Sequence, residues 1–206
     1  MKGVETTKQP PQAVGVSTSV FAALCLQLNI ALGKAWYLRS FTVPQEAQAG
    51  TTWLEFEGIM RSSTVFVNGK RVCEHVSGYT PLLCPIDAAV SHGASNHLAV
   101  HVDAVASASW WYDGGGIYRN VWLHTASKLR VAPFGVYLPA TVTGDIVDLR
   151  ADAVVNVATT LQSSGRSHSI ARVRHVVRDG GGQVVGDVTS EPVRLRGSAQ
   201  LKLDSS

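Results

Sequence analysis

A tight hairpin within residues 63–73 constrains the fold more than any other feature of this chain. Two short runs of alternating apolar and polar side chains flank the dipeptide Asn68-Gly69. Asn and Gly tolerate positive φ at both central positions of a two-residue turn. A turn this short joins antiparallel neighbours, because parallel strands need a long crossover connection. The sequence therefore predicts an antiparallel sheet around this hairpin.

Short apolar runs recur through the first half of the chain. Leu98, Val100 and Val102 occupy every second position, which is typical of a strand with one buried face. Charged residues make up only 16% of the chain, and no long helical pattern separates the apolar runs. Further strands are expected over residues 36–43, 51–56, 82–86 and 117–124. We therefore predict an all-β fold.

The second half of the chain shows the same pattern with a different composition. No Trp occurs after a short polar stretch at residues 125–128, although the first half contains all five. Asp179 and the three glycines that follow it are predicted to form a hairpin turn rather than a linker. Strands are expected over residues 128–131, 135–138, 147–158, 169–177 and 184–188. We predict three parts: an N-terminal segment at 1–35, a β-sandwich at 36–126 and a smaller sandwich at 127–206, which could be incomplete.

The N-terminal segment is the hardest part to interpret. Residues 13–32 are apolar in bulk, but polar residues such as Ser17, Gln27 and Asn29 interrupt them, which argues against a membrane span. Residues 20–26 could serve as the core of a secretory signal, although the preceding segment is barely positive. Localisation therefore stays open between the cytoplasm and secretion, and no membrane partner is expected.

Charge and cysteine content narrow the function classes. The formal charge of +3 comes from Lys and Arg scattered along the chain, whereas a nucleic-acid surface shows clustered basic residues. Cys25, Cys73 and Cys84 are too few and too irregularly spaced to specify a disulfide framework or a zinc site. His97 and His101 would lie about 13 Å apart on a strand, too far for shared metal ligation. We expect no nucleic acid, metal or cofactor.

Four motifs in fixed order carry a family resemblance. They are FEGIMRSSTVFVNGKRV at residues 56–72, SGYTPL at 77–82, NHLAVHVD at 96–103 and WWYDGGGIYRNVWLH at 110–124. Together they resemble the sugar-binding domain of family 2 glycoside hydrolases, the family of β-galactosidases and β-glucuronidases. Residues 36–124 carry the strong part of the resemblance, and a weaker part continues into VAPFGVYLPATVTG. Four ordered motifs distinguish it from a match to one short motif.

The resemblance implies a jelly-roll-like sandwich followed by an immunoglobulin-like sandwich. In the family these domains precede a TIM barrel that bears two catalytic glutamates. We expect the barrel to be absent here, because about 250 residues are needed for one. The chain has six Glu, and none follows an Asn as the family's acid/base residue does. This chain alone is therefore predicted to be inactive, with no catalytic residues.

The aromatic loop at residues 110–113 contains the candidate sugar-binding residues. The flat rings of Trp110, Trp111 and Tyr112 can contact the apolar faces of sugars, while Asp113 can accept hydrogen bonds from hydroxyls. Burial of these rings at the end of the sandwich is the alternative. In the family this loop forms one wall of a composite active site. The family more often has a polar residue where this chain has Trp110, so the sugar stays open.

A second group of residues is predicted to have structural roles. Glu57 and Arg119 are expected to form an ion pair beneath the loop, and Gly116 is expected to serve backbone geometry rather than a phosphate site, because a strand follows it. Asn68 and Gly69 form the predicted hairpin turn.

Three functions remain open from the sequence. The first is the non-catalytic sugar-binding portion of an enzyme that hydrolyses β-galactosides or related β-glycosides, with a catalytic barrel domain as partner. The second is a stand-alone carbohydrate-binding module. The third is an assembly module whose exposed strand edges associate, including with a second copy of the chain.

Overall fold

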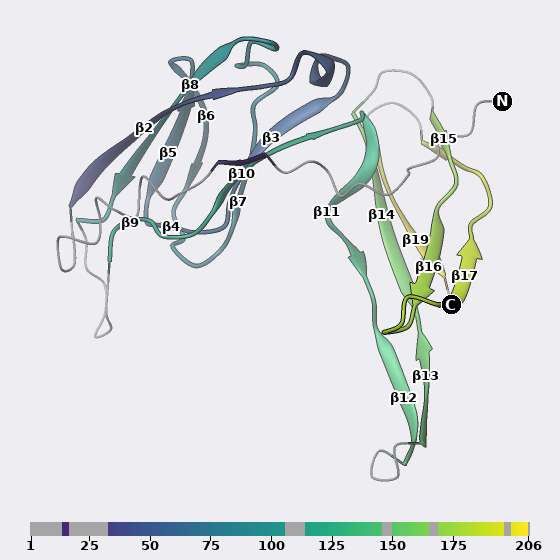
Figure 1. Cartoon of the computed structure of the whole chain (residues 1–206). Helices are drawn as coiled ribbons and strands as arrows, with labels where there is room; N and C mark the ends of the chain where they lie inside the picture. The colour runs from purple at the N-terminus through teal and green to yellow at the C-terminus, as the bar shows by residue number, and fades with distance from the viewer. Residues whose placement is uncertain are drawn as a thin grey trace. The chain divides into compact units, whose positions relative to one another are not determined.

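A computed structural model describes residues 14–16, 33–105, 114–145, 150–164, 169–195 and 199–205 of the chain. Strands dominate these residues, and a short 3-10 helix at Gln45–Ala49 is the one helical element among them. The prediction of an all-β fold is confirmed. Within the described residues, none of the helical structure is long and apolar enough to cross a membrane. The described residues divide into two compact units, at 14–127 and 128–205 (Figure 1).

The first unit is a sandwich of two four-stranded antiparallel sheets with a small two-stranded ribbon. One sheet has the strand order β2-β8-β5-β6, the other β1-β10-β3-β7, and the ribbon pairs β4 with β9. The strands are β1 (Val14–Val16), β2 (Lys34–Thr42), β3 (Thr51–Phe56), β4 (Ile59–Met60), β5 (Ser63–Val67), β6 (Lys70–His75), β7 (Leu82–Pro85), β8 (Ser95–Asp103), β9 (Gly116–Ile117) and β10 (Val121–Ala126).

The predicted hairpin joins β5 to β6. Asn68 and Gly69 adopt φ values of 49° and 78°, the left-handed backbone that the turn requires. The Asn68 side chain also accepts a hydrogen bond from the His97 backbone N–H and donates one to the Ala89 carbonyl. It therefore fixes the turn to β8 as well as closing the hairpin.

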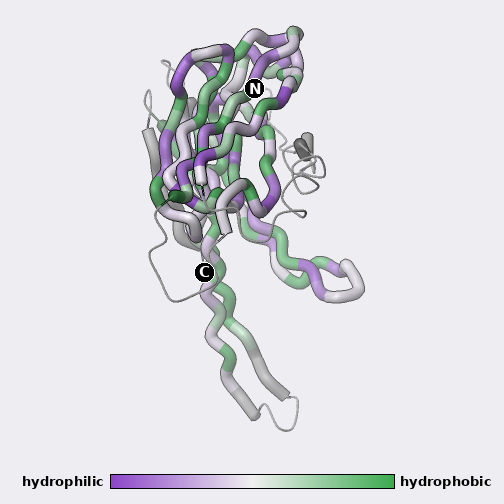
Figure 2. The backbone as a smooth tube through the Cα atoms, turned by 90° about the vertical axis from the view of Figure 1, so that its left-hand side faces the viewer, coloured by the Kyte–Doolittle hydropathy of each residue, from purple (hydrophilic) through white to green (hydrophobic). Residues whose placement is uncertain are grey.

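The core of the sandwich consists of the inward-facing side chains of both sheets. Leu98, Val100 and Val102 are buried, as their alternation predicts, and they face Leu54 and Phe56 from the other sheet. Figure 2 shows the corresponding alternation of hydrophilic and hydrophobic residues along the strands. Polar outer positions and apolar inner positions thus follow from the two-residue period of a strand.

Two polar side chains connect the loops to the sheets. Asp87 accepts hydrogen bonds from the Thr51 hydroxyl at 2.9 Å and the Thr52 backbone N–H at 2.6 Å. Asn96 is fully buried and hydrogen-bonds the backbone of Ser91 through both ends of its amide. Such satisfied polar groups hold a loop in one conformation.

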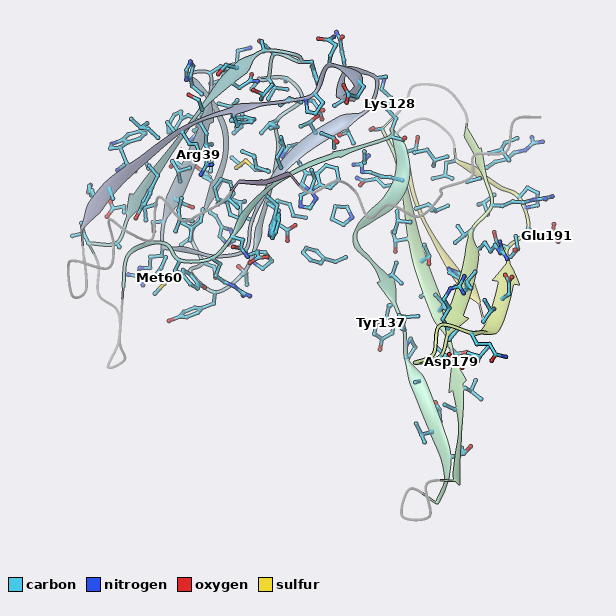
Figure 3. All side chains as sticks on the ribbon, viewed as in Figure 1. Arg39, Met60, Lys128, Tyr137, Asp179 and Glu191 are labelled. Carbon is cyan, nitrogen blue, oxygen red and sulfur yellow. A yellow bond between two sulfur atoms is a disulfide. The ribbon has the colours of Figure 1, made fainter. Side chains whose placement is uncertain are left out.

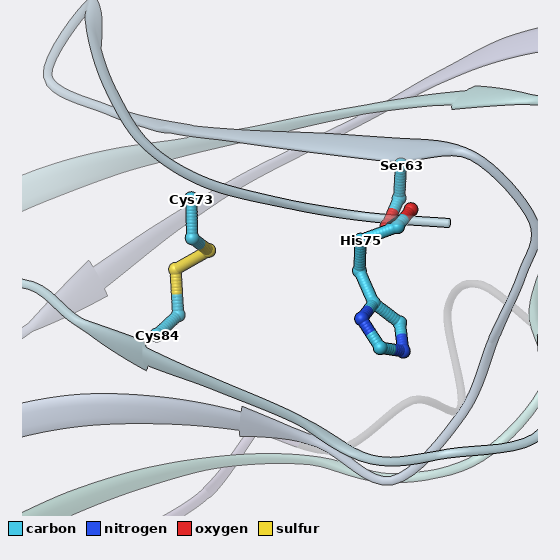
Figure 4. The surroundings of a disulfide bond; sticks show 4 residues. All are labelled: Ser63, Cys73, His75 and Cys84. Carbon is cyan, nitrogen blue, oxygen red and sulfur yellow. Dashed lines mark hydrogen bonds between the residues drawn. A yellow bond between two sulfur atoms is a disulfide. The ribbon is translucent and has the colours of Figure 1, made fainter. Parts of the chain in front are cut away.

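A disulfide joins Cys73 on β6 to Cys84 on β7, with the Cα atoms 5.8 Å apart (Figure 4). The two strands are edges of different sheets, so the bond crosslinks the open side of the sandwich. Cysteine spacing could not specify this pair, because it depends on how two sheets stack.

The structure corrects several predicted strand limits. The strand expected over residues 117–124 is two strands, β9 and β10, and they belong to different sheets. Residues 14–16, inside the predicted N-terminal segment at 1–35, form β1 and pair with β10. The first predicted strand begins at Lys34 rather than Trp36. The alternation of apolar and polar residues reveals neither a short break between two strands nor an edge strand of three residues.

The second unit contains a three-stranded sheet, β11-β14-β19, and three two-stranded ribbons, β12-β13, β15-β18 and β16-β17. Its strands are β11 (Leu129–Tyr137), β12 (Ala140–Asp145), β13 (Arg150–Val155), β14 (Val157–Ser163), β15 (Ser169–Ala171), β16 (Arg174–Arg178), β17 (Val184–Thr189), β18 (Val193–Leu195) and β19 (Ala199–Ser205).

The predicted turn after Asp179 connects β16 to β17. One strand was expected over residues 147–158, but the described part of this range contains β13 and the first residues of β14, which belong to different sheets. Strands β12, β18 and β19 were not predicted. The jelly-roll and immunoglobulin-like connections stay predictions.

Candidate functional site

The four predicted sugar-binding residues, Trp110, Trp111, Tyr112 and Asp113, lie outside the described residues. The structure does describe the chain on both sides of them, at Asp103–Val105 and from Gly114 onward. These flanking residues and their contacts form the base of the aromatic loop.

On the N-terminal side the base is held at the end of β8. The Asp103 carboxylate pairs with the Lys34 ammonium at 3.0 Å and accepts a hydrogen bond from the Val105 backbone N–H at 3.2 Å. The hydrogen bond from Lys34, followed by that from Val105, holds the pKa of Asp103 below its usual value. The Ala104 N–H donates a hydrogen bond to the Gly33 carbonyl at 2.8 Å, so the residue that follows β8 is held to the residue that precedes β2.

On the C-terminal side the base is the ribbon of β4 and β9. Gly116 has φ of 121°, a conformation that a residue with a Cβ rarely adopts, and Ile117 next to it is buried in the core. The prediction of a strand after the glycines is confirmed for β9. The Tyr118 hydroxyl donates a hydrogen bond to the Gly78 carbonyl at 2.7 Å. Gly78 lies against the side chain of Met60, which is labelled in Figure 3.

The predicted ion pair between Glu57 and Arg119 is present. The Arg119 Nε atom lies 3.8 Å from Glu57 Oε2, and the indole N–H of Trp122 donates to Glu57 Oε1 at 2.8 Å. The Arg119 side chain is 58% exposed, whereas that of Glu57 is 28% exposed. Trp122 is the closer partner of the carboxylate, and this contact was not predicted. Trp122 lies opposite Glu55 on β3, two positions from Glu57, so the strand register would have indicated the contact between Trp122 and Glu57.

A second carboxylate on the same face also has a structural partner. Glu55 Oε2 lies 2.8 Å from His124 Nε2, and the His124 ring stacks on Trp53 with ring centroids 5.0 Å apart. Both side chains of the Glu55–His124 pair are largely buried. The two carboxylates of this face therefore already accept hydrogen bonds from partners in the domain.

Across the described ranges, no group of three metal-ligating side chains comes close enough to hold an ion. His97 and His101 lie along β8, where His97 hydrogen-bonds Ser40 and His101 packs on Trp36.

The sandwich of the first unit matches the model of a known protein family. The family model described as glycosyl hydrolases family 2, sugar binding domain, matches residues 21–127. The chain belongs to this family. Its sugar-binding domain therefore includes the hairpin, the base of the aromatic loop and the four motifs that carried the resemblance.

Curated relatives of this sugar-binding domain are β-galactosidases and β-glucuronidases. A β-galactosidase of Bacteroides ovatus is 35% identical over 160 residues, which cover 77% of this chain and 18% of that protein. A β-galactosidase of Thermoanaerobacter pseudethanolicus is 28% identical over 182 residues, which cover 83% of this chain and 23% of that protein. The chain thus spans about a fifth of the length of these relatives.

Solved structures extend the likeness in fold over most of the chain. A glycosyl hydrolase family 2 member from Bacteroides cellulosilyticus has a TM-score of 0.76 at 25% identity, covering 84% of this chain and 23% of that one. A Bacteroides uniformis β-glucuronidase has a TM-score of 0.74 at 22% identity, covering 85% of this chain and 21% of that one. The likeness therefore extends beyond the sugar-binding domain into the second unit.

Proposed function

We propose that this chain is the sugar-binding, non-catalytic portion of a family 2 glycosidase that acts on β-galactosides or related β-glycosides. The match of residues 21–127 to the sugar-binding domain is the observation that carries the proposal. The β-galactosidases that match 77% and 83% of this chain support the choice of sugar.

Catalysis is assigned to a barrel domain that would act as the partner of this chain. Glycoside hydrolysis usually needs one protonated and one ionised carboxyl group flanking the glycosidic bond. Glu55 and Glu57 lie on one face, but His124 and Trp122 already hydrogen-bond to them. Two carboxylates used in this way support a structural role rather than an acid/base role.

Self-association through exposed strand edges is the other partnership that the proposal includes.

Within this function we assign the aromatic loop to one wall of the substrate pocket. Trp110 and Trp111 would stack on sugar rings with Tyr112, and Asp113 would accept hydrogen bonds from hydroxyls. The support comes from the described base of the loop, which is fixed on one side by Asp103 and on the other by the β4-β9 ribbon.

Assays of the purified chain test the proposal. We expect no turnover of an aryl β-galactoside or an aryl β-glucuronide. Turnover that is lost in the Glu55→Gln or Glu57→Gln variant would contradict the proposal, because it would place a catalytic carboxylate in this chain. Weak binding of galactosides that Trp111→Ala abolishes would support the role of the loop, and binding unaffected by Trp111→Ala would remove it.

A further inference from the structure

The outer face of the β2-β8-β5-β6 sheet carries an unusual set of exposed side chains. Trp36 is 57% exposed and Leu38 is 72% exposed, both on β2 with their side chains pointing away from the core. Large apolar side chains gathered on a polar surface mark sites of interaction. This face is separate in sequence from residues 110–113.

The strand register explains why the face is hollowed. Leu38 on β2 lies opposite Ala99 on β8, and Ala99 lies opposite Phe66 on β5. The small side chain of Ala99 thus sits between larger ones, with Trp36 one step along the same face. The result is a hollow of about 570 Å³ lined by Trp36, Leu38, Ser40, Phe66, His97 and Ala99, which we call the Trp36 hollow.

The Trp36 ring is supported while it remains exposed. Its centroid lies 5.8 Å from that of Phe66 and 4.8 Å from that of His101, with the rings tilted in both pairs. Contacts on two sides limit the conformations of the indole before any ligand binds. A ring held in this way binds an apolar ligand face with little further loss of entropy.

Polar groups border the aromatic part of the hollow. The Ser40 hydroxyl and His97 Nδ1 are 3.2 Å apart. Beyond this contact, the Ser40 hydroxyl and the second ring nitrogen of His97, Nε2, have hydrogen-bonding capacity for a ligand hydroxyl. Two ion pairs lie nearby, Lys34 with Asp103 at 3.0 Å and Arg71 with Glu74 at 3.1 Å. Arg39 on β2 also borders the hollow, but it falls between Leu38 and Ser40 in the two-residue alternation, so its side chain belongs to the opposite face of the strand.

This combination is complementary to a pyranose ring. A sugar ring offers an apolar C–H face for an indole and hydroxyls for Ser40 and His97. A neutral ring also needs no counter-charge from the Lys34–Asp103 and Arg71–Glu74 ion pairs. The volume lies within the range of sites that bind small molecules. We propose that the Trp36 hollow is a saccharide-binding site for a neutral pyranose residue of a β-linked glycan. Only the class of ligand, a saccharide, is taken from the proposed function.

Calorimetric titration of the full chain tests the Trp36 hollow. The probes are a neutral β-linked galacto-oligosaccharide, a neutral β-linked gluco-oligosaccharide and a glucuronate-containing oligosaccharide. We expect a neutral probe to bind and Trp36→Ala to weaken it by about tenfold or more, because loss of a stacking ring removes on the order of 1.4 kcal/mol. Tyr137→Ala is the matched control, since Tyr137 is a similarly exposed aromatic residue in the second unit, and it should leave the affinity unchanged.

A second variant tests the shape of the hollow. Ala99→Leu fills its floor without removing a polar group, and we expect it to weaken binding as Trp36→Ala does. Thermal unfolding of each variant identifies a change in stability. If Ala99→Leu is destabilised, the Trp36→Ala titration decides, because Trp36 is exposed and its removal leaves the core intact.

Several outcomes overturn the proposal. Binding that survives Trp36→Ala but is lost in Trp111→Ala would remove the Trp36 hollow and leave the proposed function standing. Preference for the glucuronate probe would contradict the neutral ligand. Concentration-dependent dimers that Trp36→Ala dissociates, with no glycan bound, would make this face an interface between copies. No binding of any probe would contradict both this site and sugar binding by the chain alone.

Discussion

At the scale of residues, the base of the aromatic loop depends on single polar contacts between neighbouring elements. Glu57 accepts a hydrogen bond from Trp122 and forms a longer ion pair with the exposed Arg119. Asp103 connects the end of β8 to Lys34 at the start of β2. The half-buried hydrogen bond and the exposed ion pairs should contribute differently to stability, because water screens exposed charges.

Replacement of Trp122 by Phe should destabilise the sandwich more than loss of Arg119. Trp122→Phe removes the N–H donor from a partly buried carboxylate, which we expect to cost about 1–3 kcal/mol in the free energy of unfolding. The control Arg119→Gln should cost about 1 kcal/mol or less, since that pair is exposed. Urea unfolding measures both variants. A larger effect for Arg119→Gln would reverse the assigned order of the two partners.

The Asp103 ion pair should make stability depend on pH in the acid range. Its folded pKa is lowered by the hydrogen bond from Lys34, so its contribution is present above the unfolded pKa of an aspartate, about 3.9, and is lost as the pH falls through the lower folded value. We expect the difference in melting temperature between the wild type and Asp103→Asn to shrink below about pH 4. A difference that grows on acidification would contradict the assignment.

At the scale of elements, the hairpin and the disulfide show what a sequence can and cannot specify. Asn68-Gly69 is a local signal, so the β5-β6 turn was predicted with its correct residues. The Cys73–Cys84 bond connects edge strands of two sheets, and nothing in the spacing of three cysteines reports that stacking. The break between β9 and β10 was missed for a related reason, since their separate sheets are a tertiary property.

Reduction of the disulfide should measurably weaken the sandwich. The bond closes a loop with a sequence separation of 11 residues, for which chain entropy predicts a contribution of about 2–3 kcal/mol. We expect dithiothreitol to lower the melting temperature of the wild type and to leave that of the Cys73→Ala/Cys84→Ala double variant unchanged. An identical response of both proteins to dithiothreitol would mean that the bond does not form in solution.

The same bond bears on localisation, which the sequence left open. Structural disulfides persist in oxidising compartments and are rare in the cytosol. We propose from the Cys73–Cys84 pair that the chain folds in an oxidising compartment. Mass spectrometry of the protein from its native host, alkylated without reduction, would test this, and two alkylated thiols at Cys73 and Cys84 would oppose it.

At the scale of the whole molecule, the sequence predicted the class of fold and the family, but it could not predict the sites that tertiary structure assembles. Four ordered motifs were enough for the sugar-binding domain. The Trp36 hollow was not found, because Trp36, Phe66 and Ala99 meet only through the register of three strands. The aromatic loop at 110–113 remains a sequence-based prediction.

The predicted division into domains implies two separate unfolding transitions. Phe56 is fully buried in the first unit and Leu161 is buried in the second. Phe56→Ala should lower the stability of one transition by about 3–5 kcal/mol, and Leu161→Ala should lower the other by about 2–5 kcal/mol. Differential scanning calorimetry measures both. One shared transition that both variants shift equally would show that the units unfold together.

The central claim is that this chain contacts a β-linked sugar without cleaving it. Saturation-transfer NMR of the purified chain with a β-galactosyl oligosaccharide tests both halves in one sample. We predict transfer of saturation from the protein to the sugar protons, with the anomeric signals of the oligosaccharide unchanged overnight. Absence of transfer, or the appearance of free galactose, would contradict the account.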